Sequence, residues 1–568
     1  MALHRWSVDH RSEFWEAVLD RLGIDFATAP RAILEGSAQH PVWLPGARLN
    51  VAAAALRGRP DALAIIAAAG GHTITLTRAE LAGAAGRFAA GFHRAGYRKG
   101  DRVAIAMVMN VESVIAYLGT VLAGGVVVSI ADSFSSAEIA TRLRLTDPVA
   151  VVTQDTLARS GRALPMYEKV TAAGAARCIV VDTGGEVALR SDDMTWAAFM
   201  AEDEAEPTVC AAADHTNILF SSGTTGDPKA IPWNHLTPLK AAMDGHFHQD
   251  IHAGDVVAWP TNLGWMMGPW LIYAALVNGA SLALYDDAPV GRGFTRFVAD
   301  AGVTVLGLVP SMVAAWRSAG ALDGVDWSAV RVLSSTGEAS NPEDSRWLME
   351  RVGAPIIEYC GGTEIGGGYI TGSVLQPAFP SQFTMPALGL DLRILDETGG
   401  PTDLGELFIV PPSIGLSTEV LNRDHDEVYS AGLPEADVPL RRHGDQMERT
   451  PEGGYRAHGR TDDTMNLGGI KVSSADLERV VGTIEGVAET AAIAVAPQEG
   501  GPDRLVVYAV PASGSQADPD HWRVEMQHAI RTQLNPLFQL DEVVVIDELP
   551  RTASQKVMRR TLRARHER

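Results

Sequence analysis

Cysteine is scarce in this sequence. Cys178, Cys210 and Cys360 are its three cysteines among 568 residues. Three thiols cannot form a disulfide framework, and their spacing lacks the closely placed pairs of a zinc site. The sequence therefore excludes a disulfide-stabilised scaffold and suits a reducing compartment. We expect the three thiols to be small, buried apolar groups.

Long apolar runs are also absent. The most apolar stretch, residues 103–131, is interrupted by Asn110 and Glu112 and contains three glycines. A membrane span needs about 20 consecutive apolar residues, so this stretch is better explained as buried core. The first residues lack an apolar stretch of signal-peptide length, and the last six, RARHER, carry no retention or lipidation signal. We expect a cytosolic protein without a membrane span.

Positive charge is in the minority. The sequence has 47 lysines and arginines against 69 aspartates and glutamates, which gives a net charge of −22 at pH 7. Such an excess would repel a phosphate backbone over most of the surface, which argues against a dedicated nucleic-acid binder. Any anionic ligand must therefore be bound by local cationic side chains.

The sequence does contain enough apolar material, 46% of its residues, for more than one core. Short apolar runs alternate with longer amphipathic stretches, as in DRVAIAMV, VESVIAYLGTVLAGG and VVVSIA. This alternation is typical of βαβ units on largely parallel sheets. We predict an α/β fold in which a large N-terminal domain, residues 1–461, holds stacked βαβ sheets and, after Gly399, a small β-rich subdomain. A small mobile α+β domain is predicted for residues 462–568.

One loop rich in glycine and hydroxyl groups follows a predicted strand at residues 217–220. It reads SSGTTGDPK, from Ser221 to Lys229. Backbone N–H groups and hydroxyls in such a loop suit phosphate oxygens, and Lys229 adds a positive charge. Asp227 and Pro228 separate that lysine from the preceding glycine, so this is not a P-loop. By composition alone, an ordinary surface loop is the more common explanation.

The string SSGTTGDPK resembles the phosphate-loop motif of the adenylate-forming superfamily, which includes acyl-CoA synthetases, luciferases and the adenylation domains of peptide synthetases. Further segments resemble that family's motifs in the expected order: STGEA at 335–339, YCGGTE at 359–364, GD at 444–445 with GRTDD at 459–463, and PRTASQK at 550–556. The resemblance spans almost the whole chain. It is strongest to the acetyl-CoA synthetase branch, and particularly to plant peroxisomal acyl-activating enzymes, which share GWMMGPW at 264–270. This chain lacks their peroxisomal carboxyl-terminal tripeptide.

The resemblance implies an ATP- and Mg²⁺-dependent carboxylic acid–CoA ligase. Such an enzyme forms an acyl-AMP and then passes the acyl group to coenzyme A while its small domain rotates. Two alternatives stay open. One sends the acyl group to an amine or a carrier-protein thiol, and product formation without CoA would favour it. The other is a non-catalytic nucleotide-binding relative, which a negative pyrophosphate-exchange assay would favour.

The resemblance also implies which residues bind the nucleotide and the metal. Thr225 and Glu364 would offer oxygen ligands to Mg²⁺. Asp445 and Arg460 would bind the ribose, although each alone could be a solvated surface charge. The full ATP- and AMP-binding set is Ser221, Ser222, Gly223, Thr224, Thr225, Gly226, Lys229, Gly337, Glu338, Ala339, Glu358, Tyr359, Cys360, Gly361, Gly362, Thr363, Asp445, Arg460 and Lys471.

Lys556 is implied to be the catalytic residue. On a mobile loop of the small domain, its ammonium would offset negative charge at the α-phosphate during adenylation. Asp462 occupies the hinge position. Gly468 and Gly469 would let the pantetheine chain of CoA pass close to the backbone. Arg531 is a candidate for the nucleotide end of CoA, although a helix-surface arginine is an equally good explanation.

The acyl pocket implied by the resemblance is lined by Trp265, Met266, Met267, Thr336 and Gly361. In acetate-specific relatives a tryptophan closes the pocket where Gly361 stands here. The missing indole predicts a larger pocket that methionine side chains can adapt to, and hence a short- to medium-chain or substituted acid instead of acetate. The alternative is that another side chain fills the space beside Gly361.

Overall fold

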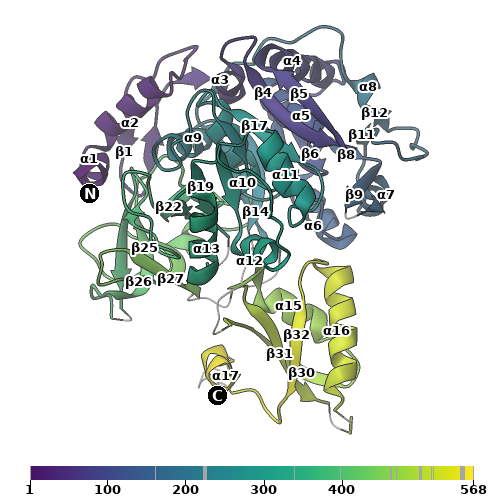
Figure 1. The fold of residues 1–568 in the computed structure, drawn as a ribbon, viewed down its shortest axis with the longest axis vertical. Coiled ribbons are helices and arrows are strands. Elements are labelled where there is room, and N and C mark those ends of the chain that lie inside the picture. Colours follow the sequence, from purple (N-terminus) through teal and green to yellow (C-terminus); the bar gives the residue numbers. More distant parts are fainter. Residues whose placement is uncertain are drawn as a thin grey trace.

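Two seven-stranded sheets form the framework of the large N-terminal part of the chain in this computed structural model (Figure 1). The first has the order β12-β11-β8-β6-β7-β14-β15, with bounds Met194–Thr195, Cys178–Val181, Ala150–Gln154, Arg102–Ala106, Val126–Ile130, His215–Ser221 and Lys229–Asn234. The second has the order β20-β19-β18-β16-β17-β4-β5, with bounds Ile356–Glu358, Val332–Ser335, Val305–Leu308, Val256–Ala258, Ser281–Tyr285, Leu63–Ala69 and His72–Thr77. Neighbouring strands are parallel except for the pairs β14–β15 and β4–β5, each of which closes one sheet. The α/β fold predicted from the sequence is confirmed.

The structure describes residues 2–159, 161–221, 227–337, 340–396, 398–460, 464–468, 470–497, 502–512, 514–515, 517–550 and 557–566. Part of the predicted site therefore lies outside the described residues, namely Ser222, Gly223, Thr224, Thr225, Gly226, Glu338, Ala339, Asp462, Gly469 and Lys556. For Arg460 and Lys471 the strand backbone is described.

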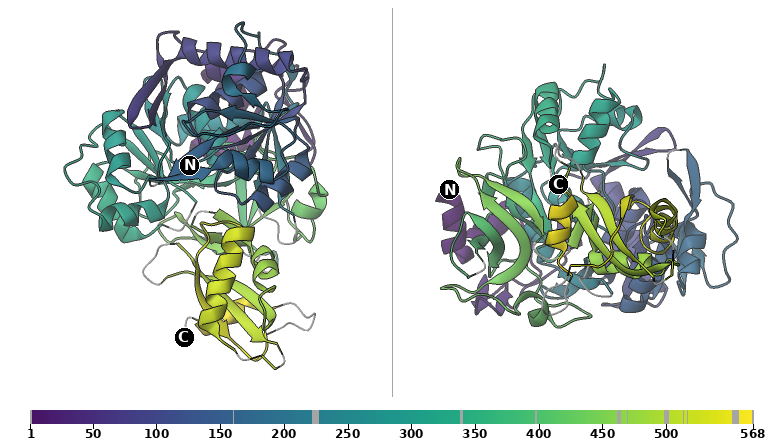
Figure 2. Two further views of the ribbon diagram at one scale, coloured as in Figure 1. Left: turned by 90° about the vertical axis from the view of Figure 1, so that its right-hand side faces the viewer. Right: turned by 90° about the horizontal axis from the view of Figure 1, so that it is seen from below.

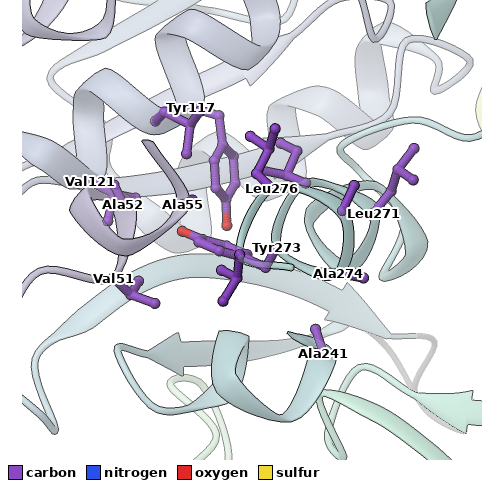
Figure 3. Packing of buried hydrophobic residues seen from close by; sticks show 14 of the residues in the cluster. Val51, Ala52, Ala55, Tyr117, Val121, Ala241, Leu271, Tyr273, Ala274 and Leu276 are labelled. Carbon is purple, nitrogen blue, oxygen red and sulfur yellow. The ribbon is translucent and has the colours of Figure 1, made fainter. Parts of the chain in front are cut away.

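The main core lies between the two sheets. Two helices fill it, α5 (Val111–Leu122) and α10 (Met267–Leu276); every residue of α10 and all of α5 except Glu112 are buried. Helices that are apolar all round are buried on all sides, as these two are. In Figure 3 the side chains of Tyr117 on α5 and Tyr273 on α10 point toward one another, with ring centres 6.0 Å apart. The remaining helices of this layer are α3 (Val51–Leu56), α4 (Arg78–Arg94) and α9 (Thr237–Phe247).

Further helices cover the outer faces of the sheets. The outer face of the first sheet packs on α6 (Ser136–Thr146) and α7 (Met166–Ala172), and that of the second on α11 (Arg292–Asp300), α12 (Pro310–Ser318) and α13 (Pro342–Val352). Within the described part of the chain, no helix has both the length and the apolar character needed to cross a membrane. Shorter peripheral elements are α1 (Ala2–Asp9), α2 (Arg11–Arg21), α8 (Trp196–Phe199), β1 (Leu34–Gly36), β2 (Pro41–Trp43), β3 (Arg48–Leu49), β9 (Thr156–Arg159), β10 (Arg162–Pro165) and β13 (Cys210–Ala211).

A β-rich region follows the second sheet. It consists of a four-stranded antiparallel sheet and a three-stranded sheet. The four strands are β24 (Asp391–Leu395), β25 (Leu404–Val410), β26 (Arg441–Arg449) and β27 (Tyr455–Arg460), and the three are β21 (Cys360–Gly362), β22 (Gly367–Thr371) and β23 (Met385–Pro386). The short helix α14 (His425–Tyr429) lies in the chain between two strands of the four-stranded sheet, β25 and β26. The β-rich region therefore begins at β21, earlier in the chain than the sequence analysis predicted, which placed its start after Gly399.

The small C-terminal domain has its own core and extends from one end of the large part (Figure 2). A three-stranded sheet, β30 (Val487–Val495), β31 (Arg504–Pro511) and β32 (Leu540–Val545), packs on α15 (Ser474–Val481) and α16 (Pro519–Gln533). A hairpin, β28 (Thr464–Leu467) and β29 (Ile470–Ser473), precedes it, and α17 (Arg559–His566) follows. The boundary at residues 461 and 462 stays a prediction, because residues 461–463 lie outside the described part.

Candidate active site

The predicted phosphate loop joins β14 to β15 at the edge of the first sheet. Its two ends are paired, because Ser221 and Lys229 stand opposite each other in the antiparallel ladder. Asn422 fixes the second end, donating through Nδ2 to the carbonyl of Pro228 (2.9 Å) and accepting from the N–H of Ala230 (2.9 Å). The Nζ of Lys229 lies 5.4 Å from the ring centre of Tyr429, the last residue of α14. The β-rich region thus holds the exit of the loop in place.

The segments predicted to bind the nucleotide follow β19 and β20, two parallel neighbours of the second sheet. Ligands of open α/β sheets bind at the carboxyl ends of the strands, which is where these segments lie. The hydroxyl of Thr336 donates to the carbonyl of Tyr359 (2.5 Å) and so ties the two segments together. The Glu358 carboxyl accepts from the hydroxyl of Ser340 (2.9 Å), and burial raises its pKa to about 7. Gly337 has a φ of +92°, which favours glycine at this turn.

The side chain of Tyr359 points into the core. Its hydroxyl donates to Oδ2 of Asp244 on α9 (2.6 Å), and the N–H of Gly368 donates to the same oxygen (2.9 Å). Lys240, one turn earlier on α9, forms an ion pair with Asp244, and both side chains are fully buried. Burial lowers the pKa of Lys240. This network leaves the backbone of the 359–362 segment as the part that can face a nucleotide.

A buried histidine lies between the acidic residues predicted for the metal and the ribose. Nδ1 of His443 is 3.8 Å from Oε1 of Glu364, and its Nε2 is 3.2 Å from Oδ2 of Asp445. The hydroxyl of Tyr369 donates to Oδ2 of Asp445 (2.5 Å). Asp445 and Arg460 are partners in the β26–β27 ladder, so the fold brings the predicted ribose pair together.

His443 and Tyr369 were missed by the sequence analysis. The period of two along a strand was the available signal for His443, because residues 443 and 445 of β26 share one face of the sheet. Tyr369 had no comparable signal, since it reaches Asp445 from β22 in the three-stranded sheet.

Glu364 suits a Mg²⁺ ion that is shared with a triphosphate. Two hydrogen bonds fix the backbone here. The indole N–H of Trp233 donates to the carbonyl of Thr363 (2.8 Å), and the backbone N–H of Ser417 donates to the carbonyl of Glu364 (2.8 Å). Within the described residues, no group of three or more His, Cys, Asp and Glu side chains is placed to hold a metal. Mg²⁺ in such sites takes one or two carboxylates and completes its shell with substrate phosphates and water, so the donor set fits. When bound, Mg²⁺ neutralises charge on the triphosphate.

The hairpin β28–β29 of the small domain touches the nucleotide segment. The side-chain amide of Asn466 donates to the carbonyl of Gly337. Gly468, predicted to lie beside CoA, sits at the hairpin turn with a φ of +61°. Pro550 and Met558, which flank the segment containing Lys556, are joined by a backbone hydrogen bond of 2.7 Å. In Figure 1 α17 lies at the left edge of the small domain, beside its sheet.

A cavity of about 460 Å³ lies between the two domains. Its aromatic wall includes Trp265, whose ring centre is 5.2 Å from that of Phe134. Five charged residues line it: Glu138 and Arg142 from α6, Asp227 before β15, and Asp476 and Arg479 from α15. The Glu138 side chain is 17% exposed, and burial raises its pKa to about 7. Arg531 is exposed on α16 and does not line this cavity.

The residues predicted for the acyl pocket come from three elements. Met267 begins α10 and Met266 directly precedes it, and Thr336 follows β19. Gly361 lies in β21, and a Cβ added there would lie 2.0 Å from the carbonyl oxygen of Gly367. The backbone of β22 therefore adjoins Gly361, so the missing indole does not leave an indole-shaped space. The size of the pocket stays a prediction.

Comparisons with known proteins agree with this geometry. The family described as AMP-binding enzyme matches residues 52–416, its C-terminal domain matches 476–556, and the acetyl-coenzyme A synthetase N-terminus matches 1–55. The chain is 46% identical to probable acyl-activating enzyme 17, peroxisomal, of Arabidopsis thaliana, over 99% of this chain and 82% of that protein. It is 44% identical to the hexanoyl-CoA synthase of Cannabis sativa, over 98% and 82%. The solved acetoacetyl-CoA synthetase from Streptomyces lividans superposes with a TM-score of 0.77 at 28% identity, covering 98% of this chain and 88% of that one. The chain therefore belongs to the AMP-binding enzyme family and, within it, to the acyl-CoA synthetases, the AMP-forming ligases that join a carboxylic acid to coenzyme A with ATP and Mg²⁺.

Proposed function

We propose that this enzyme activates a short- to medium-chain or substituted carboxylic acid and not acetate. The observation that carries the proposal is the start of α10, where Met266 and Met267 stand in the segment predicted to line the acyl pocket. Methionine side chains adapt to irregular apolar ligands. The similarity to a protein named hexanoyl-CoA synthase supports an acid of this size.

In the first half-reaction the carboxylate of the acid attacks the α-phosphate of ATP and pyrophosphate leaves. Lys229 and Lys556 offset the charge that develops on the phosphates, and Glu364 holds the metal side of the triphosphate. Asp445, fixed by Tyr369 and His443, accepts hydrogen bonds from the ribose hydroxyls. Because the interactions are pre-arranged, little reorganisation is needed during the reaction.

In the second half-reaction the thiol of CoA attacks the acyl carbonyl and AMP leaves. We propose that residues 462–568 turn about Asp462 between the two steps, which withdraws Lys556 and brings the β28–β29 hairpin to the site. The hydrogen bond from Asn466 to Gly337 supports this assignment, because it joins the hairpin to the nucleotide segment. Gly468 at the hairpin turn leaves room for a pantetheine chain.

A panel of carboxylic acids tests the proposal. Incubation with ATP and CoA is expected to release AMP and pyrophosphate with hexanoate-sized acids and little with acetate. Release of ADP, or a preference for acetate, contradicts it. Product formation without CoA would instead favour transfer to an amine or a carrier-protein thiol.

We also propose that the enzyme works in the cytoplasm. Cys178, Cys210 and Cys360 form no disulfide, which suits a reducing compartment. Microscopy of a fluorescent fusion tests this, and accumulation in peroxisomes contradicts it.

A further inference from the structure

Arg441, the first residue of β26, is a buried arginine close to the site. One nitrogen of its guanidinium donates to the carbonyl of Ser417 (2.5 Å), and another donates to the hydroxyl of the same residue (2.7 Å). The planar fork of an arginine binds two acceptors in a fixed orientation, which the compact ammonium of a lysine does not do. One side chain therefore holds Ser417 at two points.

Ser417 in turn holds the residue proposed for the metal. Its backbone N–H donates to the carbonyl of Glu364 (2.8 Å). The two segments also lie in close backbone contact, because a Cβ added to Gly415 would lie 2.2 Å from the carbonyl oxygen of Ile365. A shift of Ser417 would therefore move the backbone that carries the metal-side carboxylate.

The ring of Tyr429 connects Arg441 with the phosphate loop. The central carbon of the guanidinium lies over this ring, 4.0 Å from its centre, and Nζ of Lys229 lies over it at 5.4 Å. The face of an aromatic ring attracts cations, and the attraction is stronger where water is excluded. Tyr429 is 4% exposed, so water is largely excluded from this contact. One ring thus orients two cations, of which Lys229 stands at the end of the phosphate loop.

The charge of Arg441 is placed where it costs stability. Burial lowers the pKa of this guanidinium, while Tyr429 and Glu364 oppose the shift. A buried charge is unfavourable unless hydrogen bonds and an opposite charge compensate it. The carboxylate that supports this cation is the one proposed to hold the metal. A task at the triphosphate end of the site would explain why a cation is buried here.

We propose that Arg441 is a positioning residue for the triphosphate end of ATP. Through Ser417 it fixes the backbone of Glu364, and through the ring of Tyr429 it orients Lys229. The inference rests on the roles proposed above for Glu364 and Lys229, and it adds the side chain that holds the two relative to each other. AMP has no β- and γ-phosphates for a metal to bridge, so its binding is not expected to depend on Arg441.

Calorimetric titration of the full-length enzyme, without acid or CoA, measures the Kd for ATP with Mg²⁺ and the Kd for AMP. Arg441→Met keeps an unbranched side chain but removes the charge and the donors. It is expected to raise the Kd for ATP with Mg²⁺ roughly 10- to 100-fold, the usual effect of losing a group that orients a metal ligand, and to leave the Kd for AMP unchanged. Arg441→Lys restores the charge without the fork and is expected to recover part of the loss.

Arg442→Met is the matched control, because the neighbouring guanidinium pairs with Glu406 (2.8 Å) and lies over the ring of Phe408. It is expected to leave both Kd values unchanged. Equal increases of the two Kd values in Arg441→Met, or no increase in either, overturn the inference. If that variant does not fold, an unchanged ratio of the two Kd values in Arg441→Lys overturns it. A Glu364→Gln enzyme that binds ATP with Mg²⁺ as tightly as the wild type contradicts the proposed role of Glu364 itself, which is a separate outcome.

Discussion

Nε2 of His443 lies 3.2 Å from Oδ2 of Asp445 in the active site. The other nitrogen of the ring faces Glu364, so one imidazole links the residue proposed for the ribose with the residue proposed for the metal. The His443 side chain is 1% exposed, and electrostatic contacts in so dry a place are stronger than in water. The positions of the two carboxylates are therefore coupled.

Replacing His443 tests that coupling. His443→Ala is expected to raise the KM for ATP about tenfold, because two buried carboxylates lose their polar neighbour, and such a loss costs about 1–2 kcal/mol. The KM for the acid changes little. Initial rates at varied ATP measure the effect, and His246→Asn, at an exposed contact with Arg21, is the control. Equal ATP affinities in wild type and His443→Ala would show that the histidine has no part in placing the nucleotide.

Lys556→Ala is expected to slow acyl-AMP formation by about 10²–10³, the usual cost of one pre-arranged electrostatic partner. Thioester formation from supplied acyl-AMP and CoA is expected to survive. Pyrophosphate exchange measures the first half-reaction, and chromatography of acyl-CoA the second. Arg565→Ala, an exposed basic residue of the same tail, serves as the control. Equal loss in both half-reactions would refute the proposed turn of the small domain.

Asp244→Ala is expected to destabilise the enzyme strongly. It leaves the buried Lys240 ammonium without its carboxylate and Tyr359 without its acceptor. Removing one partner of a buried ion pair costs about 3–5 kcal/mol, and the free energy of unfolding in urea measures it. Asp61→Ala, which breaks an exposed pair with Arg59, is the control and is expected to change little. Comparable losses in the two variants would mean that burial of the first pair is unimportant.

The pKa of Glu138, about 7 in the folded enzyme, predicts a pH dependence of stability. Burial raises this pKa above the ordinary value of 4.5, although Arg142 and Arg479 oppose the shift and Asp476 adds to it. The folded state therefore binds the extra proton, so the stabilisation is complete below about pH 4.5 and is lost as the pH rises through 7. The loss is at most about 3 kcal/mol.

Thermal unfolding from pH 4 to 8 measures this contribution. Glu138→Gln keeps the shape of the side chain without its proton equilibrium, so its curve is expected to fall less steeply with pH than that of the wild type. Parallel curves for the two proteins would show that Glu138 does not titrate in this range. Glu168→Gln, on the neighbouring α7, provides a control carboxylate with no part in the interdomain cavity.

The arrangement of the sheets was predictable because parallel strands buried on both faces appear as continuous apolar runs. Residues 103–106 and 126–130 are such runs and form β6 and β7. The antiparallel closing pair β14–β15 was harder to predict, since the segment between the two strands, rich in glycine and hydroxyl groups, indicates a ligand-binding loop and not a tight hairpin turn.

Contacts between distant segments account for what the sequence could not reveal. Tyr359 was predicted as part of the nucleotide site, but its hydroxyl is committed to Asp244, 115 residues earlier. Likewise no local motif marks Trp259 and Gly307. The indole of Trp259 lies directly on Gly307 because of the register between β16 and β18. Spacing along the chain indicates which residues share a face; it does not indicate which strand lies beside them.

Trp265 stands where the two domains meet, with its indole against Phe134 on one side and the apolar core of the small domain on the other. A turn of the small domain would take that core away and bring water to the ring. Indole emission moves to longer wavelength in water, so Trp265 is a built-in optical reporter. Rapid-mixing fluorescence of the unlabelled enzyme would then time the change between the two half-reactions directly.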